Sequence, residues 1–392
     1  MDLVPDERLS DNIVGTDAYE VPPRPKKEFL PWHRPRKQLV RNWQWAEQIE
    51  RLLQKMHPEA GTLRYLGLPG TDLLDLRYFY KTICEPRQLG LRFLGFNSDA
   101  GSGNDLQVEL NISLDEVKKL ELVDPLSDVI PDDFCRLADE NSLAFKRTRN
   151  LGPYDVINLD LCDGFGSHAP GIMDDTNYNA VAQLLAIQVH NKHPWLLLLT
   201  TRAGQTHVHA ESLKRLIPKY AQNLVDCAEF LGASTEAFSI ADSVLMEEAL
   251  KNPVRFLGVF VTSLCKWLTV LAMSTNPQSE TEVKSVIGYR VDHDCPCEDL
   301  ISIAFCFEPR LARVSDPLGL VSQPSQSIDE CKIATQALKR VARLVNADRI
   351  LEQDSAVRKE MTDSTALLLE VARYEKAEYY RWVTETEGWS FS

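Results

Sequence analysis

Two short strand-like runs, the second of them almost entirely apolar, limit most strongly what this chain can fold into. They cover residues 154–161 and 195–201, and each is too short for an ordinary helix. Such runs are typical of strands that are buried on both faces, as in a parallel sheet whose connecting helices cover both sides. A helical pattern at about residues 177–190 lies between them, so the order strand, helix, strand predicts a parallel sheet.

Further strand-like runs complete this pattern. Two of them, at residues 63–68 and 91–97, precede the clearest strand, and two more, at 283–291 and 300–308, are joined by a turn and predict a hairpin. We expect an α/β fold with a Rossmann-like, mostly parallel sheet, a terminal antiparallel β-hairpin, a helical insertion and a helical C-terminal extension. The predicted segments are an extended basic arm (1–35), a leading helix (36–60), a Rossmann-like core (61–207), the helical insertion (208–280), the hairpin (281–312), and a linker with C-terminal helices (313–392).

The composition is that of a soluble protein, with 44% apolar and 26% charged residues. The longest apolar stretch, at about residues 256–273, is interrupted by Ser263, Lys266 and Trp267, so no membrane span is expected. The N-terminus lacks the basic and then apolar order of a signal peptide, which predicts a cytoplasmic location.

The 9 cysteines have no regular spacing, which favours reduced thiols over a disulfide framework. Several lie in apolar surroundings, where cysteine behaves as a small core residue; these are Cys84, Cys227, Cys265 and Cys306. The cluster at residues 293–297 lacks the second ligand pair of a structural zinc site, so no metal is expected.

The charge is unevenly distributed. The net charge is −14, yet residues 22–45 hold seven Lys or Arg against one acid, so this segment carries +6 and the remainder −20. Aromatic residues interleave with these basic residues, and we name residues 24–45 the basic-aromatic arm. Such a mixture can bind nucleic acid, can anchor a protein partner, or can pack on its own acidic domain, and the sequence leaves all three open.

Five strand–helix alternations followed by an antiparallel hairpin is an order that resembles the class I S-adenosylmethionine-dependent methyltransferases. In such enzymes a glycine-rich turn follows the first strand and lets the backbone approach the cofactor. The resemblance places S-adenosylmethionine at this turn, here Gly67-Leu68-Pro69-Gly70-Thr71-Asp72, and its ribose beside polar side chains after the second strand. The candidate cofactor-binding residues are Gly67, Pro69, Gly70, Asp72, Asn97 and Asp99.

The fourth strand ends in Asn158-Leu159-Asp160-Leu161-Cys162-Asp163-Gly164-Phe165-Gly166, which resembles the D-x-D-P-F-G stretch of the tRNA guanine dimethyltransferases. There the acid and the following backbone carbonyl hold the exocyclic amine for methyl transfer. Here Leu161 stands in the place of the proline, and two more residues intervene. The candidate catalytic residues are Asp160, Asp163 and Phe165, with His168 as a possible general base.

Three functions follow as hypotheses. The first is a divergent methyltransferase that acts on nucleic acid or a nucleic-acid-like amine. The second is a catalytically degenerate methyltransferase-like scaffold subunit of a multiprotein complex, favoured by the irregular glycine turn. The third is a metal-dependent nuclease in which Asp155, Asp160 and Asp163 bind magnesium.

Overall fold

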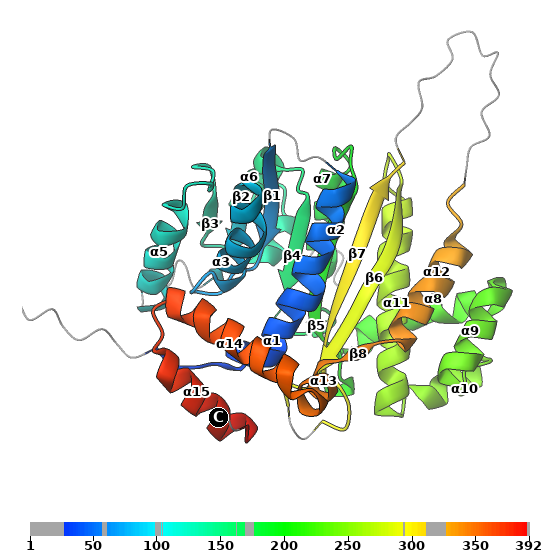
Figure 1. Cartoon of the computed structure of the whole chain (residues 1–392). Helices are drawn as coiled ribbons and strands as arrows, with labels where there is room; N and C mark the ends of the chain where they lie inside the picture. Colours follow the sequence, from blue (N-terminus) through cyan, green and yellow to red (C-terminus); the bar gives the residue numbers. More distant parts are fainter. Residues whose placement is uncertain are drawn as a thin grey trace, which may run out of the picture.

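A mixed sheet forms the centre of the molecule (Figure 1). The computed structural model describes residues 27–56, 61–98, 103, 105–161, 163–168, 176–292, 295–310 and 327–389. Within these residues the sheet is 8-stranded, in the order β3-β2-β1-β4-β5-β7-β6-β8. The strands are β1 (Thr62–Gly67), β2 (Gly90–Phe96), β3 (Asp128–Ile130), β4 (Val156–Asp160), β5 (Trp195–Arg202), β6 (Ser279–Tyr289), β7 (Leu300–Pro309) and β8 (Val345–Asn346).

Helices connect the strands and extend the chain at both ends. Before the sheet and along its first half they are η1 (Pro31–His33), α1 (Pro35–Val40), the π-helical η2 (Arg41–Ala46), α2 (Glu47–Lys55), α3 (Leu74–Phe79), η4 (Tyr80–Cys84), α4 (Glu85–Arg87), α5 (Asp105–Lys118), η6 (Phe134–Ala138) and α6 (Leu143–Leu151). The later ones are α7 (Asn177–Gln188), η7 (Gln205–His207), α8 (Ala210–Asp226), α9 (Ala228–Phe238), α10 (Ser243–Ala249), α11 (Pro253–Met273), α12 (Glu330–Ala342), α13 (Ala347–Gln353), α14 (Ser355–Val371) and α15 (Lys376–Glu387).

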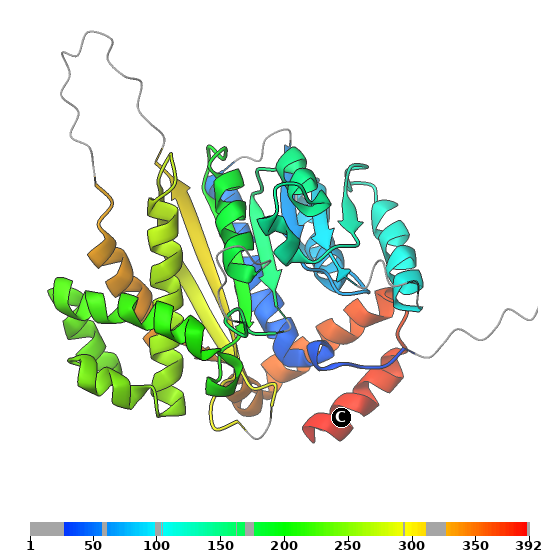
Figure 2. The same cartoon turned by 180° about the vertical axis from the view of Figure 1, so that it is seen from behind.

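The helices cover both faces of the sheet because its strands are apolar on both sides. Along β5, Leu198 packs into one core and Leu199 into the other, as the alternation of side chains in a strand requires. The first core joins the sheet to α1–α3, α5 and α13–α15, and the second joins it to α6, α7, α11 and α12 (Figures 1 and 2). A third cluster lies away from the sheet, among α8–α12.

The strand pairing confirms the predicted fold class. β1 to β5 pair in parallel, while β7 is antiparallel to both β5 and β6. This is the Rossmann-like sheet with a terminal antiparallel hairpin that the methyltransferase resemblance implies. The sequence pattern did not reveal the 3-residue strand β3 or the start of α5 at Asp105, since a 3-residue strand is too short to show a period.

The most apolar helix, α11, is a core helix in this structure. It is the one helix among the described residues that is long and apolar enough to cross a membrane by length and composition. Its residues from Phe256 to Cys265 are buried without interruption, and Lys266 is buried as well. The side chains that interrupt its apolar run therefore lie inside the protein.

The expectation of reduced thiols is wrong for two cysteines. Cys227, just before α9, is bonded to Cys331 on α12, across 104 residues of sequence. The pattern could not show this pair, because the two residues meet only after α12 has folded back onto α9. Among the described residues the free cysteines are Cys84, Cys135, Cys265, Cys295, Cys297 and Cys306, and no group of three or more His, Cys, Asp or Glu could hold a metal ion.

Candidate functional site

The candidate site lies at the carboxyl edge of the parallel strands, the lower edge of the sheet in Figure 1. Parallel pairing sets Gly67 at the end of β1 beside Gly95 of β2 on one side and Asn158 of β4 on the other. The turn after β1, Asn97 after β2 and Asp160 at the end of β4 therefore share this edge, where open α/β sheets bind ligands. Asp99 lies outside the described residues.

The glycines of the first turn make room for side chains of the same chain. A Cβ atom added to Gly67 would lie 2.7 Å from the ring of Tyr65, and one added to Gly95 would lie 2.7 Å from the ring of Pro69. Gly70 is different, because no atom lies within 4 Å of its Cβ position. The close backbone approach that a cofactor needs is thus taken up by Tyr65 and Pro69 at two of these three positions.

The polar group after β2 is bonded to the same turn. The side-chain amide of Asn97 donates a hydrogen bond of 3.0 Å to the carbonyl oxygen of Pro69. This bond fixes the end of β2 against the turn after β1. An amide also lacks the negative charge that makes a carboxylate a strong acceptor for ribose hydroxyls.

Asp72 is buried and already has two partners. Its carboxylate accepts a hydrogen bond of 2.5 Å from Lys27 Nζ and one of 2.7 Å from the hydroxyl of Tyr374. Burial, followed by the charge of Asp72, raises the pKa of Tyr374, so its hydroxyl remains a donor. Both carboxylate oxygens are engaged by residues from the two ends of the chain.

Asp160 forms an ion pair with the leading helical segment. Lys37 Nζ on α1 lies 2.5 Å from Asp160 Oδ1, and the Lys37 side chain is 4% exposed against 23% for Asp160. The same ammonium lies 4.5 Å from the ring centre of Trp45. A carboxylate that is paired in this way is not free to hold a substrate amine.

Phe165 does not join Asp160 in one substrate site. Asp160 faces α1, whereas Phe165 is 1% exposed and packs into the core on the opposite face of the sheet. Its ring contacts Tyr178 and Trp267, with centroids 4.7 and 5.6 Å away. The aromatic residue of the resemblance is therefore a core residue in this fold.

Asp163 and His168 are exposed on the loop that follows β4. His168 Nδ1 lies 2.9 Å from the hydroxyl of Ser167, and its backbone carbonyl accepts a hydrogen bond from Ser212. The three acids of the nuclease hypothesis do not form one open group, because Asp155 is fully buried and paired with Arg64. The structure thus assembles no hard-ligand cluster from them.

The basic-aromatic arm, from Lys27 onward, packs on its own domain, which is one of the three alternatives that the sequence left open. Its basic side chains are paired with acids of the same chain, at the carboxyl edge, on α5 and in the C-terminal helices. The ion pairs are Lys27–Asp72, Lys27–Glu109, Arg34–Glu387, Arg36–Asp348, Arg36–Glu387, Lys37–Asp160 and Arg41–Asp75. The positive charge of the described part of the arm, residues 27–45, is therefore matched inside the molecule. The excess of Lys and Arg was the signal in the sequence, but it could not identify these partners.

His33 belongs to the same basic-aromatic arm and is fully buried. Its ring accepts a hydrogen bond of 3.1 Å from the backbone N–H of Leu30, and its carbonyl accepts one of 2.8 Å from Tyr379. Burial lowers the pKa of His33 from 6.5 to about 4; the charge of Asp72 opposes this shift, while Arg41 and Lys27 add to it. The imidazole is thus neutral in the folded protein near neutral pH.

This buried imidazole predicts a loss of stability in mild acid. The unfolded chain takes up the proton near pH 6.5 and the folded chain only near pH 4, so stability is full above pH 6.5 and falls as the pH drops between these values. Between about pH 7 and about pH 4.5 the loss from this group is roughly 2 kcal/mol. In His33→Asn, which keeps an acceptor for Leu30, urea unfolding at both pH values should show a loss that is smaller by that amount. Equal losses in both proteins would contradict this assignment.

Strand order and the covered edge together define a Rossmann-like α/β protein whose carboxyl edge is covered by residues of its N-terminal and C-terminal segments. The model of the PP_RS20740-like family matches residues 26–384, and the chain belongs to this family. No curated protein matches the chain in sequence. Among solved structures it is similar to a protein of Listeria monocytogenes that is provisionally assigned to the class I S-adenosylmethionine-dependent methyltransferases. The identity is 11% and the TM-score 0.38, over 86% of this chain and 72% of that one.

The residues at this edge do not fit S-adenosylmethionine as they stand. Gly67 is covered by Tyr65, Asp72 is held by Lys27 and Tyr374, and Asp160 is held by Lys37. A cofactor could reach these groups only after the arm had moved and several buried ion pairs had broken.

Proposed function

We propose that this protein is a methyltransferase-like scaffold that does not transfer methyl groups and that works as a binding subunit of a protein complex. The observation that carries this proposal is the ion pair between Asp160 and the buried ammonium group of Lys37. It neutralises the carboxylate on which amine methylation would depend. Breaking such a pair leaves an uncompensated charge in a poorly solvated place, which is strongly unfavourable.

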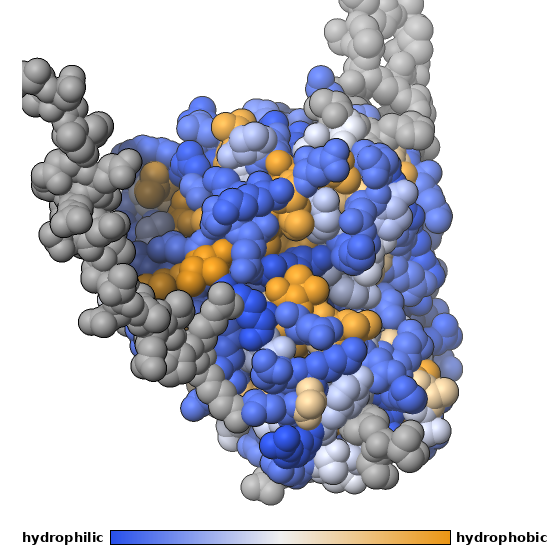
Figure 3. Space-filling view, turned by 60° about the vertical axis from the view of Figure 1, so that its left-hand side comes forward, coloured by the Kyte–Doolittle hydropathy of each residue, from blue (hydrophilic) through white to orange (hydrophobic). Residues whose placement is uncertain are grey.

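Charge and surface favour a protein as the partner. The chain carries a net charge of −14, and the basic residues of the arm from Lys27 onward are paired internally, which weakens the attraction for nucleic acid. Figure 3 shows a mainly hydrophilic face that hydrophobic patches interrupt. Large exposed apolar side chains on two helices of this side are Leu106, Val108 and Ile112 of α5 and Leu367 and Val371 of α14. Apolar positions of this kind are typical of protein contacts.

Calorimetric titration with S-adenosylmethionine and with S-adenosylhomocysteine tests the proposal. We expect no heat of binding from either ligand to the full chain, because the groups that would hold them are engaged. A methyltransferase of known affinity, titrated in parallel, verifies the ligands. Micromolar binding to the full chain would refute the proposal.

A matched variant separates a lost site from a closed one. Lys27→Met with Lys37→Met removes the two ammonium groups that neutralise Asp72 and Asp160. The proposal predicts that this variant also fails to bind either ligand, since Tyr65 still covers Gly67. Binding by the variant alone would mean that the arm gates a working site, which would overturn the scaffold assignment.

The second candidate is a divergent methyltransferase that acts on nucleic acid or a nucleic-acid-like amine. It is favoured by the open Cβ side of Gly70 and by the exposed Asp163 and His168 on the loop after β4. This candidate requires that Asp160→Ala abolishes methyl transfer to nucleic acid. Activity in the wild type that is lost in this variant would support it, and unchanged turnover in the variant would exclude Asp160 from catalysis.

A further inference from the structure

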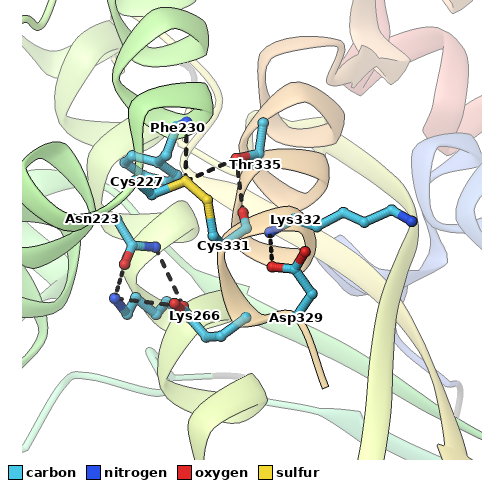
Figure 4. Close-up of a disulfide and its surroundings, with 9 residues drawn as sticks. Asn223, Cys227, Phe230, Lys266, Asp329, Cys331, Lys332 and Thr335 are labelled. Carbon is cyan, nitrogen blue, oxygen red and sulfur yellow. Dashed lines mark hydrogen bonds and ion pairs between the residues drawn. A yellow bond between two sulfur atoms is a disulfide. The ribbon is translucent and has the colours of Figure 1, made fainter. Parts of the chain in front are cut away.

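The disulfide between Cys227 and Cys331 lies apart from the carboxyl edge, among the helices that follow β5 (Figure 4). Cys227 is the N-cap residue of α9, and Cys331 is the second residue of α12. The bond therefore joins the first turns of two helices. It also ties α9 to α12, which packs against β6 and α11.

The two cysteine residues differ in exposure. Cys227 is 3% exposed, whereas the Cys331 residue is only partly buried. A thiolate that attacks a disulfide must reach one sulfur in line with the bond, so access decides which sulfur is attacked. The incoming thiol would form its bond with Cys331, and Cys227 would depart as the thiolate.

The surroundings of Cys227 suit a departing thiolate. Its sulfur accepts a hydrogen bond of 3.3 Å from the backbone N–H of Phe230. The hydroxyl of Thr335 lies 3.7 Å away and donates its proton to the carbonyl of Cys331 at 2.8 Å. The start of α9 adds the partial positive charge of a helix N-terminus, which stabilises thiolates. A stabilised leaving thiolate both speeds the exchange and favours the reduced state.

The charged groups drawn near the bond come from α11 and the start of α12, with two lysines against two acids. Lys266 on α11 is 3.5 Å from Glu330 on α12 and is hydrogen-bonded to Asn223 on α8 (Figure 4). Asp329 caps α12 by accepting a hydrogen bond from the backbone N–H of Lys332. The backbone N–H of Phe230 therefore acts on Cys227 without a dominant opposing charge among these groups.

We propose that Cys227–Cys331 is a reversible thiol–disulfide switch that a dithiol reductant opens through Cys331. The first thiolate of the reductant forms a mixed disulfide with Cys331 and releases the Cys227 thiolate, which then takes up a proton. The second thiol of the reductant then attacks the reductant's other sulfur, which is bonded to Cys331 in the mixed disulfide, and Cys331 is released. The reductant leaves as a disulfide, and the protein has gained two electrons and two protons as two thiols. The cytoplasmic location that the sequence predicts would supply such dithiols.

Opening the switch would loosen α9 from α12 without unfolding the sheet. The cluster among α8–α12 remains buried around Phe230 and Leu338, so it holds the helices together after reduction. The covalent limit on their separation is lost, however. We expect faster amide hydrogen exchange in α9 and α12 after reduction, and unchanged exchange in β1–β5.

Two single variants test which sulfur is accessible. The folded Cys227→Ser variant keeps Cys331 as a free thiol, and the folded Cys331→Ser variant keeps Cys227 as a free thiol. Peptide-resolved mass spectrometry after alkylation with iodoacetamide should show Cys331 reacting at least about tenfold faster than Cys227, because the buried thiol is shielded. Equal rates, or a faster Cys227, would overturn the proposed direction of attack.

The reducibility of the bond is tested in the folded wild type. We expect dithiothreitol to reduce Cys227–Cys331 without denaturant, and oxidised dithiothreitol to restore it. A bond that is reduced only after the protein unfolds would refute the switch.

Discussion

Replacing Arg36 with alanine is expected to lower the free energy of unfolding by about 3–5 kcal/mol. This is the largest effect that we expect from a single change to the ion pairs at the carboxyl edge of the sheet. Arg36 is buried on α1 and is paired with Asp348 of α13 and with Glu387, 2.6 Å away at the end of α15. The side chains of the two acids are 3% and 2% exposed. Without Arg36 the two carboxylates would lose the guanidinium that they share. Urea denaturation followed by circular dichroism measures the loss.

Arg51 on α2 provides the matched control for this prediction. It pairs with Glu47 one helical turn away, and its side chain is 57% exposed. Such exposed pairs contribute about 0.5 kcal/mol or less, so Arg51→Ala should change stability by no more than this. A loss below about 1 kcal/mol for Arg36→Ala would show that the closed edge does not depend on this arginine.

Removing Asp160 is expected to destabilise the protein more than removing Lys37. In Asp160→Ala the Lys37 ammonium stays buried with only the ring of Trp45 beside it, which should reduce the free energy of unfolding by about 2–4 kcal/mol. In Lys37→Met the carboxylate of Asp160 can still reach water, because it is 23% exposed, so a loss of about 1–2 kcal/mol is expected. Denaturation of both single variants measures this asymmetry.

The double variant Lys37→Met with Asp160→Ala completes a thermodynamic cycle. We expect it to be more stable than the sum of the single losses predicts, by about 2 kcal/mol, because neither charge is left alone. The exposed pair Lys81–Glu85 is the control and should give a coupling near zero. Additive losses at Lys37 and Asp160 would mean that the ion pair does not stabilise the closed edge, and would remove the main support for the scaffold proposal.

The sheet could be predicted from the sequence because its central strands are uniformly apolar. The run from Trp195 to Thr201 is buried in the structure as its composition indicates, and the hairpin β6–β7 has the order that the pattern predicts. The leading helix was recognisable from its apolar period, although the π-helical turn of η2 was not. β3 is only 3 residues long and carries no period that a pattern could reveal.

The sequence could place the candidate residues at the carboxyl edge of the sheet, but it could not predict the contacts that they make there. The positions of Asn97 and Asp160 at strand ends follow from the strands themselves. The partners of the residues at this edge do not follow from the strands. Lys37 lies 123 residues before its partner Asp160, and Tyr374 lies 302 residues after its partner Asp72. Contacts over such separations depend on how the N-terminal and C-terminal segments fold onto the sheet. The periodicity of a single sequence indicates only local structure, so it cannot predict them. The excess of basic residues in the arm was visible, whereas the acids that it pairs with were not.

The joining of the two chain ends has a consequence for synthesis of the protein on the ribosome. Arg36 is made 351 residues before its partner Glu387, and the hydroxyl of Tyr379 meets the carbonyl of His33 across 346 residues. Strands β1 to β5 can pair while translation continues, since domains form as their sequence becomes available. The cover over their carboxyl edge cannot form until the final helix has left the exit tunnel. A nascent chain therefore passes through a period in which the sheet exists and its polar edge, with the basic arm, is still open to the cell.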